Sequence, residues 1–354
     1  MLHTRTSRLA VSALGLAALT GALVAQPAAA GPTGSFGPTA SATVFAVNPV
    51  QSSGDQSLTD QKDSATAVPR SAYVPVTLTE LDGSGYLVGK WANVRSSTGD
   101  LAYSSSGRYH YNRSDDRFEQ VMAYYWVTEA QKYIQSLGFG QEGGLPPVNM
   151  ESQDVRINQY GADNSFSWDK KDLLRFGKGG VDDAEDAEVV VHEYGHAVHD
   201  SQVVGFGSSL DAGAIGEAFG DYLAVTVGMH AFGEPGGDLD ACVMDWDATS
   251  YTSTVPHCLR RIDRDITVDE RRNQVHYDGQ IWSRALWDIR NAIGDPELAD
   301  KVIIDAQFNF EPDTSFADAA KATINSAEDN GAAAFVDEIT KAFQDRGILP
   351  TTTP

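Results

Sequence analysis

Residues 189–199 read VVVHEYGHAVH, and this stretch decides how the rest of the chain is interpreted. Apolar residues flank the polar ones on both sides, which predicts a buried helix. His192 and His196 are four residues apart, so on a helix both imidazoles leave the same face and can bind one cation. The alternative is a surface helix that happens to contain two histidines. Burial disfavours that alternative, because an unpaired imidazole is costly away from water.

Glu193, next to the first histidine, gives the stretch a chemical role. Zinc accepts two neutral imidazoles and one carboxylate from a protein and keeps a fourth position for water, whose pKa it lowers toward neutrality. Glu193 would be the general base that takes the proton of this water. The helix is expected to begin after Asp182 as its N-cap, with Glu185 at the capping-box position.

A third zinc ligand is expected on the next helix, where residues 213–221 read GAIGEAFGD. Glu217 is the candidate ligand. Asp221 lies one turn further on the same face, where it could accept the second N–H of a ligating histidine. The alternative is two solvated acids on a helix face, and the small and apolar neighbours disfavour it because they indicate burial.

These segments resemble the gluzincin peptidases, the group similar to thermolysin and fungalysin, in which an H-E-x-x-H helix precedes an E-x-x-x-D helix. Asp163-Asn164-Ser165-Phe166 resembles that family's edge-strand segment, which implies that Asn164 and Ser165 bind substrate. Val275-His276-Tyr277-Asp278-Gly279 resembles the segment whose histidine, here His276, stabilises the tetrahedral intermediate. Arg260 and Arg261 both resemble an arginine that supports the substrate carbonyl or the ligand helix, and Arg261 is the candidate.

The chain departs from the family pattern at two points. The tyrosine that assists the oxyanion has no counterpart in residues 203–209, so Tyr277 or Tyr194 takes its role, or His276 acts with zinc alone. The aspartate expected five residues before His276 is an arginine here. Asp269 or Glu270 would then orient His276, if any acid does.

The periodicity predicts an α+β fold in which strands dominate the first half and helices the second. The resemblance implies a mostly β N-terminal lobe, a helical C-terminal lobe and a zinc site in the cleft between them. Strands are expected at residues 74–78, 86–94, 155–160 and 165–176. Helices are expected at residues 114–138, at about 214–228, from about Asp278, and three more times before the C-terminus.

The N-terminal residues predict export. Arg5 and Arg8 precede an apolar run that ends in small residues, so residues 1–30 are expected to be a signal peptide cleaved near Ala30. A membrane anchor is the alternative, but the run is shorter than the ~20 residues that span a bilayer. Residues 31–70 are expected to be a linker or short pro-segment, and residues 71–350 a catalytic domain with lobes at about 71–200 and 201–350.

Charge limits the partners. The whole chain carries a net charge of −23, and the loss of two arginines with the signal peptide leaves −25. Such a surface repels nucleic acid and anionic membranes and favours solubility or divalent cations, but charge alone names no partner. Protein or peptide substrates are what the resemblance implies, and a monomer is expected. Cys242 and Cys258 are expected to form a disulfide in an exported chain, with zinc binding by the two thiols as the weaker alternative.

Calcium is a second expected cation. Glu188 lies four residues before His192, where related enzymes place a calcium-binding acid, and Glu234, Asp238 and Asp240 could complete an oxygen cage. The alternative is that these acids are solvated and offset the helix dipole.

The expected function is therefore that of a secreted zinc endopeptidase. The resemblance implies a hydrophobic residue after the cleaved bond. Two alternatives remain open at this point. One is a zinc aminopeptidase, and the other is a secreted binding protein on the same fold that has lost its catalytic activity.

Overall fold

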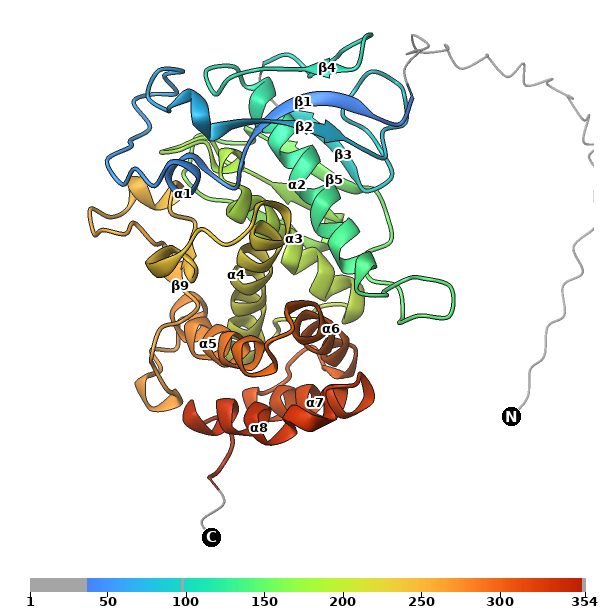
Figure 1. Cartoon of the computed structure of the whole chain (residues 1–354), viewed down its shortest axis with the longest axis vertical. Coiled ribbons are helices and arrows are strands. Elements are labelled where there is room, and N and C mark those ends of the chain that lie inside the picture. The colour runs from blue at the N-terminus through green and yellow to red at the C-terminus, as the bar shows by residue number, and fades with distance from the viewer. Residues whose placement is uncertain (1–36, 97–98, 352–354) are drawn as a thin grey trace, which may run out of the picture. The chain divides into compact units, whose positions relative to one another are not determined.

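The computed structural model describes residues 37–96 and 99–351 of the chain. Strands gather in its N-terminal part and helices in its C-terminal part, which confirms the α+β prediction. Figure 1 shows helices α3 (Ala187–Gln202) and α4 (Leu210–Phe232) in the middle, with strands β1 to β5 above them and the C-terminal helices α5 (Val275–Ile293) to α8 (Val336–Asp345) below. The expected signal peptide and its cleavage site lie outside the described residues.

The first sheet has the order β2-β1-β4. Strand β1 (Ala40–Phe45) runs antiparallel to β2 (Tyr73–Leu78), with Ala40 opposite Leu78, and parallel to β4 (Arg108–Tyr109). Strand β1 falls inside the expected linker, so this part of residues 31–70 is folded. Its inward side chains are fully buried although they are small, and their small size is why the segment was not predicted as a strand.

The second sheet has the order β3-β5-β7-β6. Strands β3 (Ala92–Ser96), β5 (Gln153–Ile157) and β7 (Leu173–Arg175) are parallel, and β6 (Phe166–Trp168) pairs antiparallel with β7. The single strand expected at residues 165–176 is therefore two strands joined by a short turn. Strand β6 is an edge strand, which leaves one side of its backbone free to pair with another chain.

Helix α3 (Ala187–Gln202) carries the two histidines, and it packs against α2 (Arg117–Ser136) and α4 (Leu210–Phe232). Its N-cap is Asp186, whose side chain accepts a hydrogen bond from the Glu188 N–H at 3.0 Å. The N-cap prediction of Asp182 was wrong. A short turn (Asp183–Glu185) intervenes and leaves Asp186 in the extended conformation that an N-cap requires.

The helices after α4 follow the expected order. Helix α5 begins three residues before Asp278, so His276 lies in its first turn. Three further helices follow, as predicted. These four helices are α5 (Val275–Ile293), α6 (Pro296–Ala306), α7 (Phe316–Asp329) and α8 (Val336–Asp345). The remaining elements are short: α1 (Pro49–Ser53), β8 (Cys242–Val243), β9 (Arg260–Arg261), and the 3-10 turns Arg70–Ala72, Asp169–Lys171, Gly237–Leu239, Asp247–Ser250, Val268–Glu270, Gln307–Asn309 and Ala333–Phe335.

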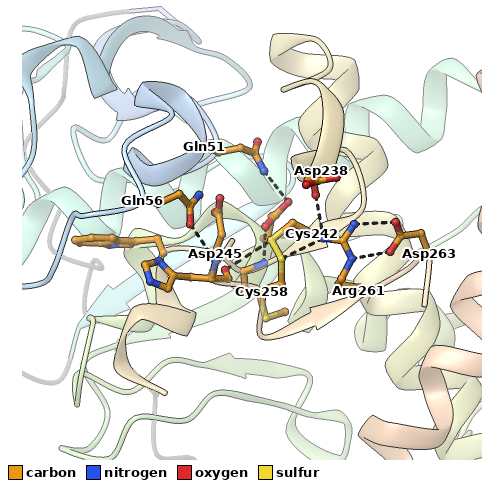
Figure 2. The surroundings of a disulfide bond; sticks show 12 residues. Gln51, Gln56, Asp238, Cys242, Asp245, Cys258, Arg261 and Asp263 are labelled. Carbon is orange, nitrogen blue, oxygen red and sulfur yellow. Dashed lines mark hydrogen bonds and ion pairs between the residues drawn. A yellow bond between two sulfur atoms is a disulfide. The ribbon is translucent and has the colours of Figure 1, made fainter. Parts of the chain in front are cut away.

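A disulfide joins Cys242 and Cys258, as predicted (Figure 2). It closes the loop that connects β8 to β9, and those two strands pair antiparallel. A disulfide across a loop of this length stabilises the fold by roughly 3 kcal/mol. No helix within the described ranges is both long and apolar enough to cross a membrane.

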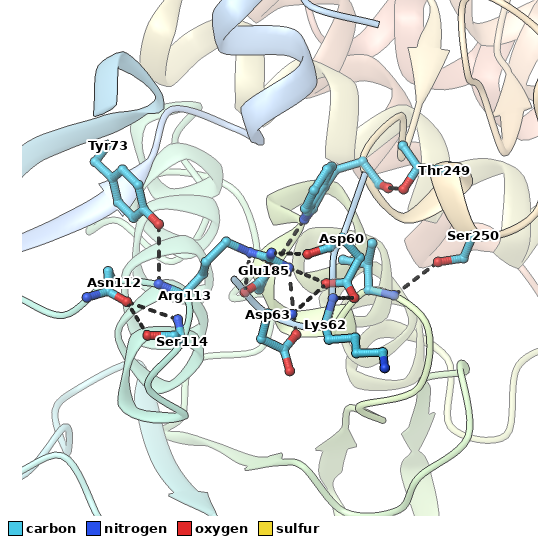
Figure 3. A network of polar contacts seen from close by, with 12 residues as sticks. Asp60, Lys62, Asp63, Tyr73, Asn112, Arg113, Ser114, Glu185, Thr249 and Ser250 are labelled. Carbon is cyan, nitrogen blue, oxygen red and sulfur yellow. Dashed lines mark hydrogen bonds and ion pairs between the residues drawn. The ribbon is translucent and has the colours of Figure 1, made fainter. Parts of the chain in front are cut away.

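A buried ion pair connects the start of α3 to the N-terminal segment (Figure 3). The fully buried guanidinium of Arg113 donates two hydrogen bonds to Glu185 Oε2, at 3.0 Å from Nε and 2.8 Å from Nη2. The same guanidinium donates to the Asp60 carbonyl at 2.6 Å, and Trp246 Nε1 donates to Glu185 at 3.1 Å. This network holds part of the expected linker against the helix that carries the histidines.

Candidate active site

The structure brings His192, His196 and Glu217 together. One ligand atom from each residue lies within 4.8 Å of those from the others. The His192 Nε2 atom is 3.4 Å from Glu217 Oε2, and His196 Nε2 is 3.8 Å from Glu217 Oε1. Both histidines leave one face of α3 because four residues separate them, and α4 supplies the carboxylate.

Two glycines allow α3 and α4 to approach closely enough to form this group. A Cβ atom on Gly195 would lie 3.0 Å from the Gly220 Cα atom. A Cβ atom on Gly220 would lie 2.6 Å from His192 Nδ1. Any larger side chain at Gly220 would therefore displace the imidazole or separate the helices.

The Asp221 carboxylate lies behind the His192 ring, on the side away from Glu217. Its Oδ1 atom is 2.9 Å from His192 Nδ1, which leaves the Nε2 atom directed toward Glu217. Arg260 holds this aspartate through two hydrogen bonds, from Nε at 2.6 Å and from Nη2 at 2.7 Å. A fixed carboxylate behind a histidine sets the tautomer and orientation that a metal ligand needs.

Arg260, and not Arg261, is therefore the arginine of the site. The Arg261 guanidinium is bound to both Asp263 carboxylate oxygens at 2.7 Å and to the Asp238 carbonyl at 3.0 Å, beside the disulfide (Figure 2). Neighbouring residues of a strand point to opposite faces, and this alternation separates the two side chains. The choice of Arg261 is corrected by this geometry.

The charges of the group suit a cation. Burial lowers the pKa of His196 to about 4, so its imidazole is neutral at physiological pH. Burial opposes protonation of His192 as well, but the nearby carboxylates of Asp221 and Glu217 raise its pKa to about 10. The carboxylates of Asp221 and Glu217 thus stabilise a positive charge at His192. This charge is either a proton on the ring or a metal ion bound to it.

A zinc ion fits these residues. The Oε2 atoms of Glu217 and Glu193 are buried and make no hydrogen bond. Two imidazoles and one carboxylate are the donor set that zinc takes in catalytic sites. Burial also raises the pKa of Glu193 to about 7, which suits a group that must accept and release a proton near neutrality.

His276 faces the same group from the start of α5. Its Nε2 atom lies 3.3 Å from Glu217 Oε2. Gln274 orients the ring, because its side-chain Nε2 is 2.7 Å from His276 Nδ1 while its Oε1 accepts the Tyr277 N–H. The amide nitrogen must donate, so His276 Nδ1 accepts and the ring proton lies on Nε2, on the side of the zinc group.

The expected orienting acids do not take this role. No contact between His276 and Asp269 or Glu270 occurs in the described part of the chain, and Glu270 instead caps its own turn. The two candidate tyrosines are also engaged elsewhere. Tyr194 is buried and donates to Gln131 at 2.7 Å, and the Tyr277 ring lies against Arg272.

Asn164 and Ser165 lie where the resemblance implies. They line a cavity of about 470 Å³ together with the zinc group, Glu193 and His276. Strand β6 begins at the next residue and is the edge of its sheet. An extended peptide could therefore pair with β6 while its backbone passes over Glu193.

The predicted calcium residues separate into two sets. Glu188 is buried in a cluster with Asp186 and Asp245, whose oxygens lie within 4.8 Å of one another. Within the described ranges, Glu234, Asp238 and Asp240 join no such cluster. Asp240 instead accepts the Gly236 N–H at 2.6 Å and closes its own turn.

Comparison with known proteins gives the family. Residues 159–350 match the fungalysin metallopeptidase family (M36), which is more than half of the chain, and the chain belongs to this family. It is similar to extracellular metalloproteinase 9 of Uncinocarpus reesii (strain UAMH 1704), with 22% identity over 245 residues that cover 58% of this chain and 36% of that protein. The chain thus spans little more than a third of that relative's length.

A solved structure shares the fold. The precursor of protealysin, a metalloproteinase from Serratia proteamaculans, superimposes with a TM-score of 0.51 and 19% identity. The match covers 65% of this chain and 79% of that one. At this identity the likeness shows the α+β fold of the two chains and no more.

A cluster of three aspartates near the site was not predicted from the sequence. Asp163, Asp183 and Asp247 come together beside the zinc group from three separate segments, with ligand oxygens within 4.8 Å of one another. In the sequence, the acids before helix α3 are explained by Asp182 as the N-cap and Glu185 at the capping-box position, and Asp183 is given no role of its own. Asp183 and Asp247 are both buried in the folded chain, and no local spacing in the sequence indicates that they meet.

Proposed function

We propose that this chain is a secreted zinc endopeptidase that uses Glu193 as its general base. The observation that carries the proposal is the group of His192, His196 and Glu217, with Glu193 beside it and an edge strand along the same cavity. Membership of a metallopeptidase family supports peptide bonds as the substrate.

The residues divide the chemistry among themselves. A zinc ion held by the three ligands would polarise the carbonyl of the cleaved bond and acidify a water molecule. Glu193 accepts the proton from that water and delivers it to the leaving amine. Asp221 keeps His192 in the tautomer that binds metal through Nε2, and Arg260 keeps Asp221 ionised and in place.

His276 stabilises the oxyanion. Its protonated Nε2 can donate a hydrogen bond to a negatively charged oxygen near the zinc group, and Gln274 holds the ring in that orientation. This arrangement supports the alternative in which His276 acts with zinc and without a tyrosine, since Tyr194 and Tyr277 are engaged elsewhere.

The substrate is expected to bind as an extended strand. Strand β6 offers backbone groups for pairing, and Asn164 and Ser165 precede it at the cavity wall. A backbone-paired substrate can extend in both directions, which supports an endopeptidase over an aminopeptidase.

The test is hydrolysis of casein and of blocked peptides by the purified protein after zinc loading. We expect internal cleavage that a chelator abolishes and that Glu193→Ala lacks, while the variant still binds zinc. Cleavage of peptides with a free N-terminus alone would favour the aminopeptidase. Bound zinc without cleavage of any substrate would favour the binding protein.

We also propose a calcium site at Asp186, Glu188 and Asp245. All three are buried, and Asp245 Oδ2 makes no hydrogen bond. Hard cations prefer such carboxylate oxygens. Added calcium should raise the melting temperature of the wild-type protein, and Glu188→Gln should remove most of that rise. An equal rise in the variant would contradict the site.

Export and a monomeric state complete the proposal. The secreted protein should begin at Gly31, which N-terminal sequencing of the culture medium would show. Light scattering of the purified protein should give the mass of one chain. A mature N-terminus elsewhere or the mass of a dimer would refute the corresponding statement.

A further inference from the structure

A second, smaller cavity adjoins the catalytic one. It has a volume of about 90 Å³ and shares His192, Glu193 and His276 with the zinc side. Its opposite wall carries two carboxylates, those of Asp183 and Asp247. A side chain placed in this cavity would therefore belong to a residue next to the cleaved bond.

Arg260 also lines this cavity, but its guanidinium is hydrogen-bonded to Asp221 and leaves the aspartates without a hydrogen-bonded cation. Asp183 and Asp247 are 2% and 5% exposed, and the Oδ1 atom of each makes no hydrogen bond. Asp163 adds a third carboxylate with an unpartnered Oδ1 atom. Among the described residues, no lysine, arginine or histidine forms an ion pair with any of the three. Burial accordingly raises the pKa of Asp183 to about 7.

The three aspartates are held in place by their surroundings. The Ser165 hydroxyl donates to the Asp183 carboxylate, and the Tyr251 hydroxyl donates to the Asp163 carbonyl at 2.8 Å. Gly180 leaves room for Asp163, because a Cβ atom there would lie 2.1 Å from Asp163 Oδ2. The carboxyl groups of Asp183 and Asp163 are thus positioned at the end of the cavity before any ligand arrives.

One part of the remaining wall is apolar, although Tyr251 and Arg260 also line the cavity. Val189, Met244 and Leu259 line the cavity between the zinc side and the aspartates. Lysine and arginine combine an alkyl stem with a charged end, so such a side chain would meet matching surfaces along its length. A small hydrated cation would gain nothing from the apolar wall, and this favours a side chain over a metal ion.

We infer that Asp183 and Asp247, with Asp163 behind them, select a lysine or arginine side chain next to the cleaved bond. The inference rests on the proposed peptidase function and adds its substrate class. It replaces the hydrophobic preference that the family resemblance implies at the residue after the cleaved bond. Charge-assisted hydrogen bonds inside a buried cavity supply the discrimination.

The experiment compares blocked peptides that differ at one position, with lysine, arginine, leucine or glutamate there. Mass spectrometry identifies the cleaved bond and the side on which the selected residue stands. We expect kcat/KM for lysine or arginine to exceed that for leucine by about tenfold or more, since hydrogen bonds to charged groups discriminate by at least this factor. Preference for leucine would overturn the inference.

Variants then locate the selectivity. Asp183→Asn and Asp247→Asn should each lower cleavage of the lysine peptide by about tenfold and leave cleavage of the leucine peptide within about twofold. Retained cleavage of the leucine peptide shows that the variant is folded. The matched control is Asp318→Asn, an exposed acid on α7 that should change neither rate. Loss of both rates together in the site variants would contradict a role in selectivity.

A binding measurement separates this inference from the proposed function. The ligands are two peptide hydroxamates that bind zinc and differ at one position, lysine in one and leucine in the other. The lysine compound should bind the zinc-loaded protein about tenfold more tightly, whether or not the protein cleaves peptides. Equal affinity would overturn the inference while leaving the peptidase intact. Calcium binding at the three aspartates is tested in the Glu188→Gln background. If calcium raises the melting temperature of Glu188→Gln but not that of the double variant Glu188→Gln/Asp183→Asn, the three aspartates bind a metal ion and not a substrate side chain.

Discussion

Two buried acidic regions of this protein differ in where their positive charge comes from. Around Glu185, the chain supplies its own cation, because Arg113 is fully buried and bound to that carboxylate (Figure 3). Although burial alone would lower the pKa of Arg113, the adjacent carboxylates raise that pKa above its ordinary value. Around Glu217 and the three aspartates, no arginine or lysine of the described residues forms such an ion pair, and we propose that a cation from outside the chain binds there.

This difference separates structure from function. A carboxylate that meets an internal arginine fixes the fold, and here it attaches the N-terminal segment to the start of α3. A buried carboxylate without such a partner remains ready for a zinc ion or a substrate side chain. Variants of the two regions should accordingly change stability in one and activity in the other.

The largest effect is expected at the general base. Glu193→Gln should lower kcat by about 10²- to 10⁴-fold, because the amide cannot accept the proton of the attacking water. Zinc content and melting temperature should stay close to those of the wild type. A variant that retains full activity would exclude Glu193 as the base.

The next effect concerns the internal cation. Arg113→Leu should lower the free energy of unfolding by about 3–5 kcal/mol, because Glu185 loses its buried partner. The matched control is Arg117→Leu, whose half-exposed pair with Asp115 contributes about 0–1 kcal/mol. Chemical denaturation measures both. Equal losses in the two variants would remove the distinction between the regions.

The carboxylate behind His192 has a smaller effect. Asp221→Asn should weaken zinc binding by about 10- to 100-fold, since the amide no longer fixes the His192 tautomer. Competition with a chelator of known affinity measures this change. Unaltered zinc affinity would show that Asp221 has no part in the metal site.

The remaining effect is a dependence of stability on pH. Burial raises the pKa of Asp183 from 3.8 to about 7, so the folded protein keeps this proton at pH values where the unfolded chain has lost it. The free energy of unfolding therefore falls as the pH rises from about 4 to about 7, by at most about 1.4 kcal/mol per unit for one proton. Asp183→Asn should flatten this slope in zinc-free protein, and an identical slope would contradict the assignment.

The sequence predicts the parts of the site that local spacing determines. His192 and His196 share a helix face, and Glu217 and Asp221 share another, so their positions follow from the helical repeat. Residues brought together from distant segments gave no such signal. The Arg113 network, the three-aspartate cluster and the choice of Arg260 over Arg261 all depend on tertiary packing.

Two other features of the structure were not predicted, and each has a local cause. Strand β1 is built from small residues, so its alternation of buried and exposed positions was too weak to be recognised. Gln274 was overlooked because a carboxylate was expected to orient His276, whereas an amide performs the same task through its N–H. The signal peptide and the lobe boundaries stay predictions.

The most direct test of the account is anomalous diffraction at the zinc absorption edge from crystals of the zinc-loaded protein. The account predicts one strong peak about 2.0–2.2 Å from His192 Nε2, His196 Nε2 and a Glu217 oxygen. A zinc peak at the three aspartates instead, or no peak between the two histidines, would contradict it.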